Sequence, residues 1–315
     1  MNKKLDKYEV PDWMGRFPFE PDKKKVCVIR KEMEASFIYG FEGTEIENYV
    51  YTSTDNLSVV EWGLASGLHI GPAAQHLHGD ECYYLYEGEL TVCNPESGES
   101  FVLNEGEAIY IPQETRHQGF NFGSKKVTVI ACMAPVVWAE DTGSVIPQVK
   151  NPRFLKGPEE PKYGKTYPLY VLPQVKRTMD ALGNWPAPSS ALRKEKQMVA
   201  LRSENRLNLI SGKERHIFYS FMVSNDYMNV AIATIPIATT SEIEKHNGDE
   251  VINVLEGELC VRIVNPGDGM KGETAFPHMR VRNRESLLIP AGVSHQYINI
   301  SNDVIKAYMA IAPRL

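Results

Sequence analysis

Histidine and glutamate residues occur at spacings that suit metal binding. His76 and His78 are two residues apart, so on a β-strand both side chains would lie on the same face. Glu81 follows them, and His117 lies further along in PQETRHQGFN. Three neutral imidazoles and one carboxylate suit a borderline divalent ion such as Mn, Fe, Ni, Cu or Zn. The sequence therefore predicts a metal site formed by these four residues, with positions left for water and substrate.

A second set of candidate ligands has a different composition. Glu244 and His246 have the same two-residue spacing, Glu250 follows them, and His295 lies in PAGVSHQYIN. One imidazole is therefore replaced by a carboxylate. Two histidines and two glutamates still form a competent site, with a preference for harder ions such as Mn. The alternative is that this second set belongs to a scaffold that has lost its metal.

The two sets lie in two copies of one repeated sequence. GDECYYLYEGELTV, which begins at Gly79, and GDEVINVLEGELCV, which begins at Gly248, agree at eight of fourteen positions. A second shared block follows in each copy: GEAIYIPQETRHQGFN begins at Gly106 and RESLLIPAGVSHQYIN begins at Arg284. Each copy covers about a hundred residues, and such a repeat indicates a duplicated domain.

Both copies have the pattern of short strands. Runs rich in Val, Ile, Tyr and Thr are interrupted by Gly, Asn-Pro and Pro signals, which is typical of an all-β sandwich or barrel. Between the copies, the Pro- and Gly-rich residues 141–198 form an irregular connector, with one short helix predicted in LPQVKRTMDALG, which ends at Gly183. Residues 1–27 form an N-terminal arm. We expect the arm or the connector to pack on the other domain or on a second subunit.

Composition excludes several classes of protein. The net charge is −6 and no block of Lys and Arg forms a basic stripe, so we expect no nucleic-acid partner. No apolar run reaches the roughly 20 residues that span a bilayer, so we expect a cytoplasmic protein without a membrane partner. The five cysteines are scattered without CxxC spacing, so we expect reduced thiols rather than disulfides or a thiolate zinc site.

These motifs resemble those of the cupin family, and the chain resembles a bicupin. The family's two motifs are G(X)5HXH(X)3-4E(X)6G and G(X)5PXG(X)2H(X)3N. The first copy matches them at Gly71, His76, His78, Glu81, Gly88, Gly106, Pro112, His117 and Asn121, and the second copy matches at His246, Glu250, Gly257, Pro290, Gly292, His295 and Asn299. The resemblance implies two cupin barrels, each a double-stranded β-helix or jelly roll, at residues 28–140 and 199–315.

The first copy departs from the motif spacing. Only two residues separate His78 from Glu81, one fewer than the family minimum, and only four separate Gly71 from His76. A one-residue slip turns a strand's side chains to the other face. Either a bulge corrects the register, or Glu81 is not a ligand and the first site is a three-histidine site. Glu114 also replaces the expected glycine before His117.

The resemblance implies a metal-dependent enzyme that acts on a small polar molecule. A divalent ion can polarise a carbonyl and acidify the neighbouring C–H, and a carboxylate such as Glu81 or Glu244 would then move the proton, as in sugar isomerases. Tyr83 would lie on the same strand face as Glu81 and could offer a hydroxyl to the pocket. We expect the first copy to be the better catalytic candidate and the protein to be a homodimer.

Two alternatives stay open. With Fe, the same ligands could hold a chelating substrate beside O2, as in a dioxygenase. Gentisate-type bicupin dioxygenases lack the motif glutamate, which both copies keep, so the sequence favours the isomerase. The third class is a metal-free binding or storage cupin, which would hold no stoichiometric ion.

Overall fold

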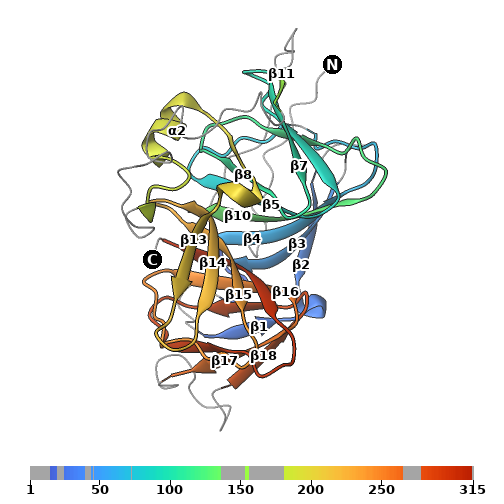
Figure 1. Ribbon diagram of the computed structural model, residues 1–315. Coiled ribbons are helices and arrows are strands. Elements are labelled where there is room, and N and C mark those ends of the chain that lie inside the picture. The colour runs from blue at the N-terminus through green and yellow to red at the C-terminus, as the bar shows by residue number, and fades with distance from the viewer. Residues whose placement is uncertain are drawn as a thin grey trace.

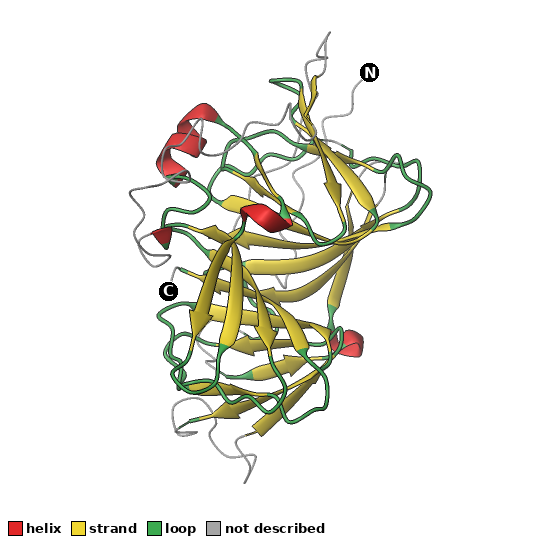
Figure 2. Cartoon of the chain, viewed as in Figure 1, coloured by secondary structure: helices red, strands yellow, loops and turns green. Residues whose placement is uncertain are grey.

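The computed structural model describes residues 15–19, 25–39, 44, 46–71, 73–135, 153–155, 181–264 and 278–313. Strands make up most of this part of the chain (Figure 2) and form two stacked barrels (Figure 1). The predicted all-β, two-barrel architecture is confirmed. No helix in the described ranges is both long enough and apolar enough to cross a membrane.

The first barrel consists of two sheets with a shared core. Its strands are β2 (Ala35–Tyr39), β3 (Ile46–Ser53), β4 (Ser58–Leu64), β5 (Asp80–Glu87), β6 (Glu89–Cys93), β7 (Glu99–Asn104), β8 (Ala108–Ile111), β9 (Gln118–Phe120), β10 (Val127–Ala134), β11 (Arg153–Leu155) and β12 (Val199–Leu201). One sheet has the order β12-β8-β5-β10-β4-β3-β2 and the other β11-β7-β6-β9. Residues such as Leu85 from the first sheet and Leu90 from the second are fully buried in one apolar cluster.

The second barrel repeats this arrangement. Its strands are β1 (Cys27–Ile29), β13 (Leu207–Ser211), β14 (Ile217–Ser224), β15 (Asn229–Ile235), β16 (Asp249–Glu256), β17 (Glu258–Ile263), β18 (His278–Arg282), β19 (Ser286–Ile289), β20 (His295–Ile298) and β21 (Ile305–Ala312). One sheet has the order β1-β19-β16-β21-β15-β14-β13 and the other β18-β17-β20. Short 3-10 turns at Lys31–Met33 and Ser203–Asn205 precede β2 and β13 at equivalent points.

The two barrels exchange one edge strand each. β1 pairs with β19, with Val28 opposite Leu287, and β12 pairs with β8, with Ala200 opposite Ile109. In Figure 1 the blue strand β1 accordingly lies among the orange and red strands of the second barrel. The last residue of the predicted arm, Cys27, therefore pairs with the second barrel, and β12, which directly follows the predicted connector, pairs with the first. The predicted domain boundaries at residues 28 and 199 place most of β1 in the first domain and all of β12 in the second, whereas each strand pairs in the other barrel. A sequence repeat does not show with which sheet a flanking strand pairs.

The large sheets of the two barrels pack against each other. All eight residues of β10 are buried, because one face of the strand lines its own barrel and the other faces the second barrel. Tyr84 and Tyr308 meet across this interface with ring centroids 5.9 Å apart. The run VTVIACMA is therefore continuously apolar rather than alternating.

The end of the connector joins the two barrels through a polar network. Helix α2 (Ser189–Glu195) carries Arg193, whose Nη2 lies 2.6 Å from Oδ2 of Asp80 and whose Nη1 lies 2.8 Å from Oδ2 of Asp226. The helix predicted in LPQVKRTMDALG falls, apart from residues 181–183, outside the described residues.

Candidate metal centres

In the first barrel, His76, Glu81 and His117 form a buried cluster. A bridge holds two segments together: the N–H of Ala74 donates to the carbonyl of His117 and the N–H of His117 donates to the carbonyl of Ala74. Glu81 lies on the neighbouring strand β5. Its Oε2 is 3.1 Å from Nε2 of His76 and 3.0 Å from Nε2 of His117. These three side chains offer one atom each to a common centre.

The donor atoms of this first cluster are already paired with one another. Nδ1 of His117 lies 3.1 Å from the carbonyl of Thr115, which turns Nε2 toward the centre. That Nε2 also lies 3.1 Å from the hydroxyl of Tyr83, so Tyr83 reaches the site as predicted for its strand face. Burial disfavours an ionised carboxylate, but the imidazoles of His76 and His117 outweigh burial and lower the pKa of Glu81 to about 2. The cluster is a closed hydrogen-bonded network.

His78 does not join this cluster, contrary to the sequence prediction. Its side chain is exposed, and the three-histidine site that the motif spacing left open is not formed. The bridge between Ala74 and His117 corresponds to one between Glu244 and His295, so His76 corresponds to His246 and Ala74 to Glu244. One extra residue in the loop before Glu81 turns His78 outward while Glu81 keeps its place on β5.

In the second barrel all four predicted ligands meet. The backbones of Glu244 and His295 exchange two hydrogen bonds of 2.9 Å, and Glu250 lies on β16. Nε2 of His246 is 3.7 Å from Oε2 of Glu244 and 3.6 Å from Oε2 of Glu250, while Nε2 of His295 is 3.2 Å from the same Glu250 oxygen. Nδ1 of His295 lies 3.1 Å from the carbonyl of Val293, which again directs Nε2 inward.

Two buried atoms at this second centre have no hydrogen-bond partner within the described part of the chain. They are Nε2 of His246 and Oε2 of Glu250. Burial would lower the pKa of a histidine, but the carboxylates of Glu244 and Glu250 outweigh it and raise the pKa of His246. Burial would raise the pKa of Glu250, but His295 and His246 outweigh it and lower it. The inward-directed Nε2 atoms of His246 and His295 and the carboxylate of Glu250 form a donor set that fits a divalent cation.

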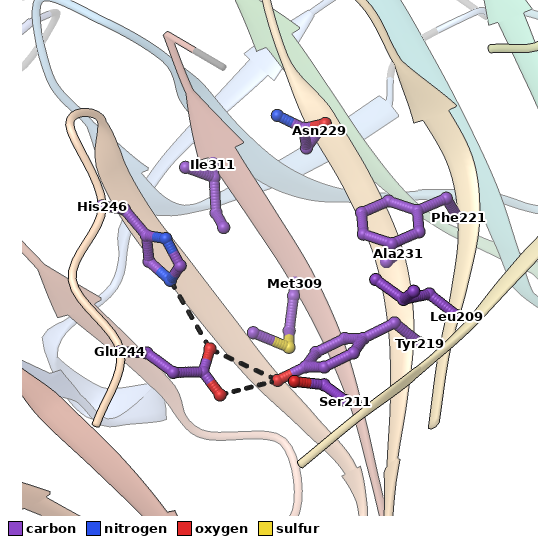
Figure 3. A pocket seen from close by; sticks show the side chains of 10 residues that line it. All are labelled: Leu209, Ser211, Tyr219, Phe221, Asn229, Ala231, Glu244, His246, Met309 and Ile311. Carbon is purple, nitrogen blue, oxygen red and sulfur yellow. Dashed lines mark hydrogen bonds and ion pairs between the residues drawn. The ribbon is translucent and has the colours of Figure 1, made fainter. Parts of the chain in front are cut away.

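A pocket opens beside this second centre (Figure 3). It is lined by Leu209, Ser211, Tyr219, Phe221, Asn229, Ala231, Glu244, His246, Met309 and Ile311. The hydroxyl of Tyr219 donates to the carboxylate of Glu244, 3.1 Å from Oε1 and 3.4 Å from Oε2. Glu244 and His246 therefore belong both to the ligand cluster and to the wall of the pocket.

Sequence reasoning missed two tyrosines at this centre. The hydroxyl of Tyr297 donates to Oε1 of Glu250 at 2.5 Å and lies 2.9 Å from Nε2 of His295. Tyr297 follows His295 by two residues on one strand, so strand periodicity could have found it. Tyr219 lies on β14, far from any motif, and nothing in the sequence singles it out.

A family model described as "Cupin domain" matches the chain at residues 60–133 and 231–311, one match in each barrel. An uncharacterised protein of Methanocaldococcus jannaschii, MJ1618, is 34% identical over 70 residues, which are 22% of this chain and 53% of that protein. The chain thus spans about half the length of this curated relative.

Solved structures resemble the whole chain. A putative glyoxylate-induced protein from Pseudomonas aeruginosa has a TM-score of 0.59 at 12% identity, with 93% of this chain and 91% of that chain covered. Oxalate decarboxylase from Bacillus subtilis, with Mn(II) centres, has a TM-score of 0.54 at 13% identity, with 93% and 80% covered. A salicylate 1,2-dioxygenase from Pseudaminobacter salicylatoxidans has a TM-score of 0.53 at 12% identity, with 82% and 72% covered. At these identities the likeness concerns the fold. With one cupin match on each of its two jelly-roll barrels, the chain belongs to the cupin family as a bicupin.

Proposed function

We propose that this bicupin is a metal-dependent enzyme that transfers a proton between neighbouring carbons of a small hydroxy-carbonyl compound, and that its second barrel is the catalytic one. The observation that carries the proposal is the buried Nε2 of His246, which has no hydrogen-bond partner in the described part of the chain and belongs to a residue that lines an open pocket. The sequence favoured the first barrel for catalysis. There, however, Glu81 and both histidines are paired with one another.

Each residue of the second centre then has a distinct role. His246, Glu250 and His295 would hold the ion, and the hydroxyl of Tyr297 fixes the Glu250 carboxylate through Oε1. A divalent ion at this position supplies Lewis acidity, which polarises a carbonyl and acidifies the adjacent C–H. Glu244 lines the pocket, so its carboxylate can accept that proton and return it to the neighbouring carbon. Tyr219 orients Glu244 by donating to it.

One observation favours a second candidate, an Fe- and O2-dependent dioxygenase. Both barrels combine two histidines with a glutamate between them in sequence, the ligand set of many Fe(II) oxygenases. The solved structures that the fold resembles include a salicylate dioxygenase.

Homodimer formation and cytoplasmic location stay predictions.

The proposal is tested by metal analysis together with hydrogen exchange. Wild-type protein purified without oxygen is analysed by inductively coupled plasma mass spectrometry, as are the His246→Ala/His295→Ala and His76→Ala/His78→Ala variants. We expect one equivalent of Mn, Zn or Ni, lost only from the first variant. In D2O, NMR spectroscopy should show deuterium entering the carbon beside the carbonyl of a turned-over aldose or ketose, and Glu244→Gln should stop this exchange while it keeps the metal.

Other outcomes would redirect the proposal. Iron with substrate-dependent O2 consumption would support the dioxygenase. Metal loss only from the His76→Ala/His78→Ala variant would move the active centre to the first barrel. Wild-type protein without stoichiometric metal would leave a binding or storage cupin.

A further inference from the structure

A second polar group lies in the pocket wall, away from the metal ligands. Asn229, the first residue of β15, is only 4% exposed and lines the pocket. It lies opposite Ile311 of β21, which in turn lies opposite Glu250 of β16. Neighbouring strands are about 4.8 Å apart, so Asn229 lies in the row of Glu250 but roughly 10 Å away across the sheet. Asn229 therefore lines the pocket at a distance from the metal ligands.

The hydrogen bonds around Asn229 fix the orientation of its amide. The N–H of Gly183 donates to Oγ of Ser224 at 2.8 Å, and that hydroxyl donates to Oδ1 of Asn229 at 2.6 Å. The hydroxyl proton needs an acceptor, so the amide oxygen must face Ser224. Nδ2 therefore points the other way, and within the described residues it has no hydrogen-bond partner. Figure 3 shows this nitrogen on the side of Asn229 that faces Ile311.

The first barrel has the same framework without the free donor. Its corresponding row is Glu81, Met133 and Ser58. The N–H of Gly15 donates to Oγ of Ser53 at 2.8 Å, and Oγ of Ser53 lies 2.9 Å from Oγ of Ser58. A serine at the position of Asn229 thus satisfies the framework completely. The asparagine adds only an NH2 group that faces the pocket, at the cost of an unsatisfied buried donor.

The pocket lining also limits the charge of what this donor can bind. No lysine or arginine is among the lining residues, which include the apolar side chains of Phe221, Met309 and Ile311. A carboxylate buried there would have no cation to compensate the loss of its hydration. A neutral oxygen would need only the one hydrogen bond.

We infer that Asn229 is a substrate-binding residue whose Nδ2 donates a hydrogen bond to a neutral oxygen, a hydroxyl or carbonyl, at the end of the substrate remote from the metal ligands. The inference rests on the proposed function. It specifies a second polar group that the substrate carries, in addition to the hydroxy-carbonyl group at the metal. It selects hydroxy-carbonyl compounds that carry a further uncharged oxygen over those that end in a methyl group or a carboxylate.

Three acids with the same metal-chelating end test this inference: 2-hydroxybutanoate, 2,4-dihydroxybutanoate and malate. By isothermal titration calorimetry on Mn-loaded protein, we expect 2,4-dihydroxybutanoate to bind about tenfold more tightly than 2-hydroxybutanoate, with malate no tighter than 2-hydroxybutanoate. Asn229→Ser should reduce the tenfold ratio to about one. The matched control Ser58→Asn, in the first barrel, should leave the ratio unchanged.

A metal-free measurement separates a binding role from a structural one. In EDTA, Asn229→Ser should melt at or above the wild-type temperature, because serine keeps the acceptor for Ser224 and removes the unsatisfied donor. A fall of more than about 5 °C would show that the amide is structural and would overturn the inference, whether or not the protein binds Mn. So would a tenfold ratio that persists in Asn229→Ser, or Mn-loaded wild type that binds none of the acids. Failure of the wild type to hold Mn would instead count against the proposed function.

Discussion

The two centres occupy the same place in two copies of one barrel, yet their donor atoms are satisfied in different ways. In the first, Oε2 of Glu81 lies 3.1 Å from Nε2 of His76 and 3.0 Å from Nε2 of His117, which closes the network. In the second, Nε2 of His246 lies 3.6–3.7 Å from the nearest carboxylates and has no hydrogen-bond partner in the described part of the chain, and a pocket adjoins it. Because a buried polar group without a partner costs stability, the open arrangement is worth keeping only where something binds.

A few substitutions account for this difference. Ala74 replaces the ligand Glu244, so the first centre has one donor fewer. A tyrosine reaches each inner histidine, but Tyr83 comes from β5 and Tyr297 from β20. Gly119 occupies the place of Tyr297 in the first copy. Both copies thus keep the strands that carry the ligands, but in the first copy the histidines and the glutamate contact one another.

The largest expected effect is on stability when the first network is broken. In EDTA at pH 7, Glu81→Gln should cost about 3–5 kcal/mol, because it leaves His76 and His117 without their carboxylate. Glu250→Gln should cost less, because Oε2 of Glu250 lies farther from its two histidines, at 3.2 and 3.6 Å, and Tyr297 can still donate to the amide oxygen of a glutamine. Urea denaturation measures both values, and a larger cost for Glu250→Gln would contradict the distinction between the centres.

The pH dependence of the same variant follows from the pKa of Glu81, which is about 2 in the folded protein against an ordinary value of 4.5. A lowered carboxyl pKa contributes stability above the ordinary value, and this contribution is lost as the pH falls toward the folded value. The difference between wild type and Glu81→Gln should therefore shrink between pH 4.5 and pH 2.

Metal removal should act on the second centre. A divalent ion at a hundredfold excess over its Kd stabilises the folded state by about 2.7 kcal/mol, so EDTA should lower the wild-type Tm by roughly 5–10 °C. His246→Ala/His295→Ala should have the same Tm with and without the ion. His76→Ala/His117→Ala should be less stable in both conditions but keep the metal-dependent shift. Differential scanning calorimetry checks this, and loss of the shift in the first-barrel variant would reverse the assignment.

The sequence predicted the framework better than the distinction between the two centres. The shared GDE and EGEL residues and the second motif located β5, β16, His117 and His295 correctly, because strand and turn patterns are local. His78 has the two-residue spacing from His76 that the motif requires, but it lies in a loop, where strand periodicity does not apply. The pocket depends on β13, β14, β15 and β21 together, and no local pattern reports such packing.

A signal for the extent of the repeat was also present in the sequence. The arm contains Gly15-Arg16-Phe17-Pro18 and the connector contains Gly183-Asn184-Trp185-Pro186, each a glycine followed by an aromatic residue and proline. Phe17 bridges to Ser53, and Trp185 bridges to Ser224. Both segments therefore belong to the duplicated unit. The match is short and the flanking sequences differ, so the sequence alone predicts an arm and a connector rather than two equivalent segments.

Restoring the missing donor should bring the centres closer together. Ala74→Glu places a carboxylate opposite His117, as Glu244 lies opposite His295. We expect the variant to bind a second equivalent of Mn at least about tenfold more weakly than the first, because the ion must displace existing hydrogen bonds among Glu81, His76 and His117. Titration followed by Mn electron paramagnetic resonance checks this. A single equivalent at millimolar Mn would show that the missing donor does not explain the difference.

The smallest effect concerns the turn before each inner histidine. Glu114 has φ of 59° and Gly292 has φ of 85°, so both turns use the left-handed region, and their N–H groups donate to the carbonyls of His76 and His246. The left-handed region costs a residue with a side chain about 1–2 kcal/mol, whereas glycine adopts it freely but gains entropy in the unfolded chain. Glu114→Gly should therefore stabilise the protein by about 0.5–1 kcal/mol, and Gly292→Ala should destabilise it by a similar amount. Thermal denaturation in EDTA measures both changes, and destabilisation by Glu114→Gly would show that the Glu114 side chain contributes more to the first centre than its backbone strain removes.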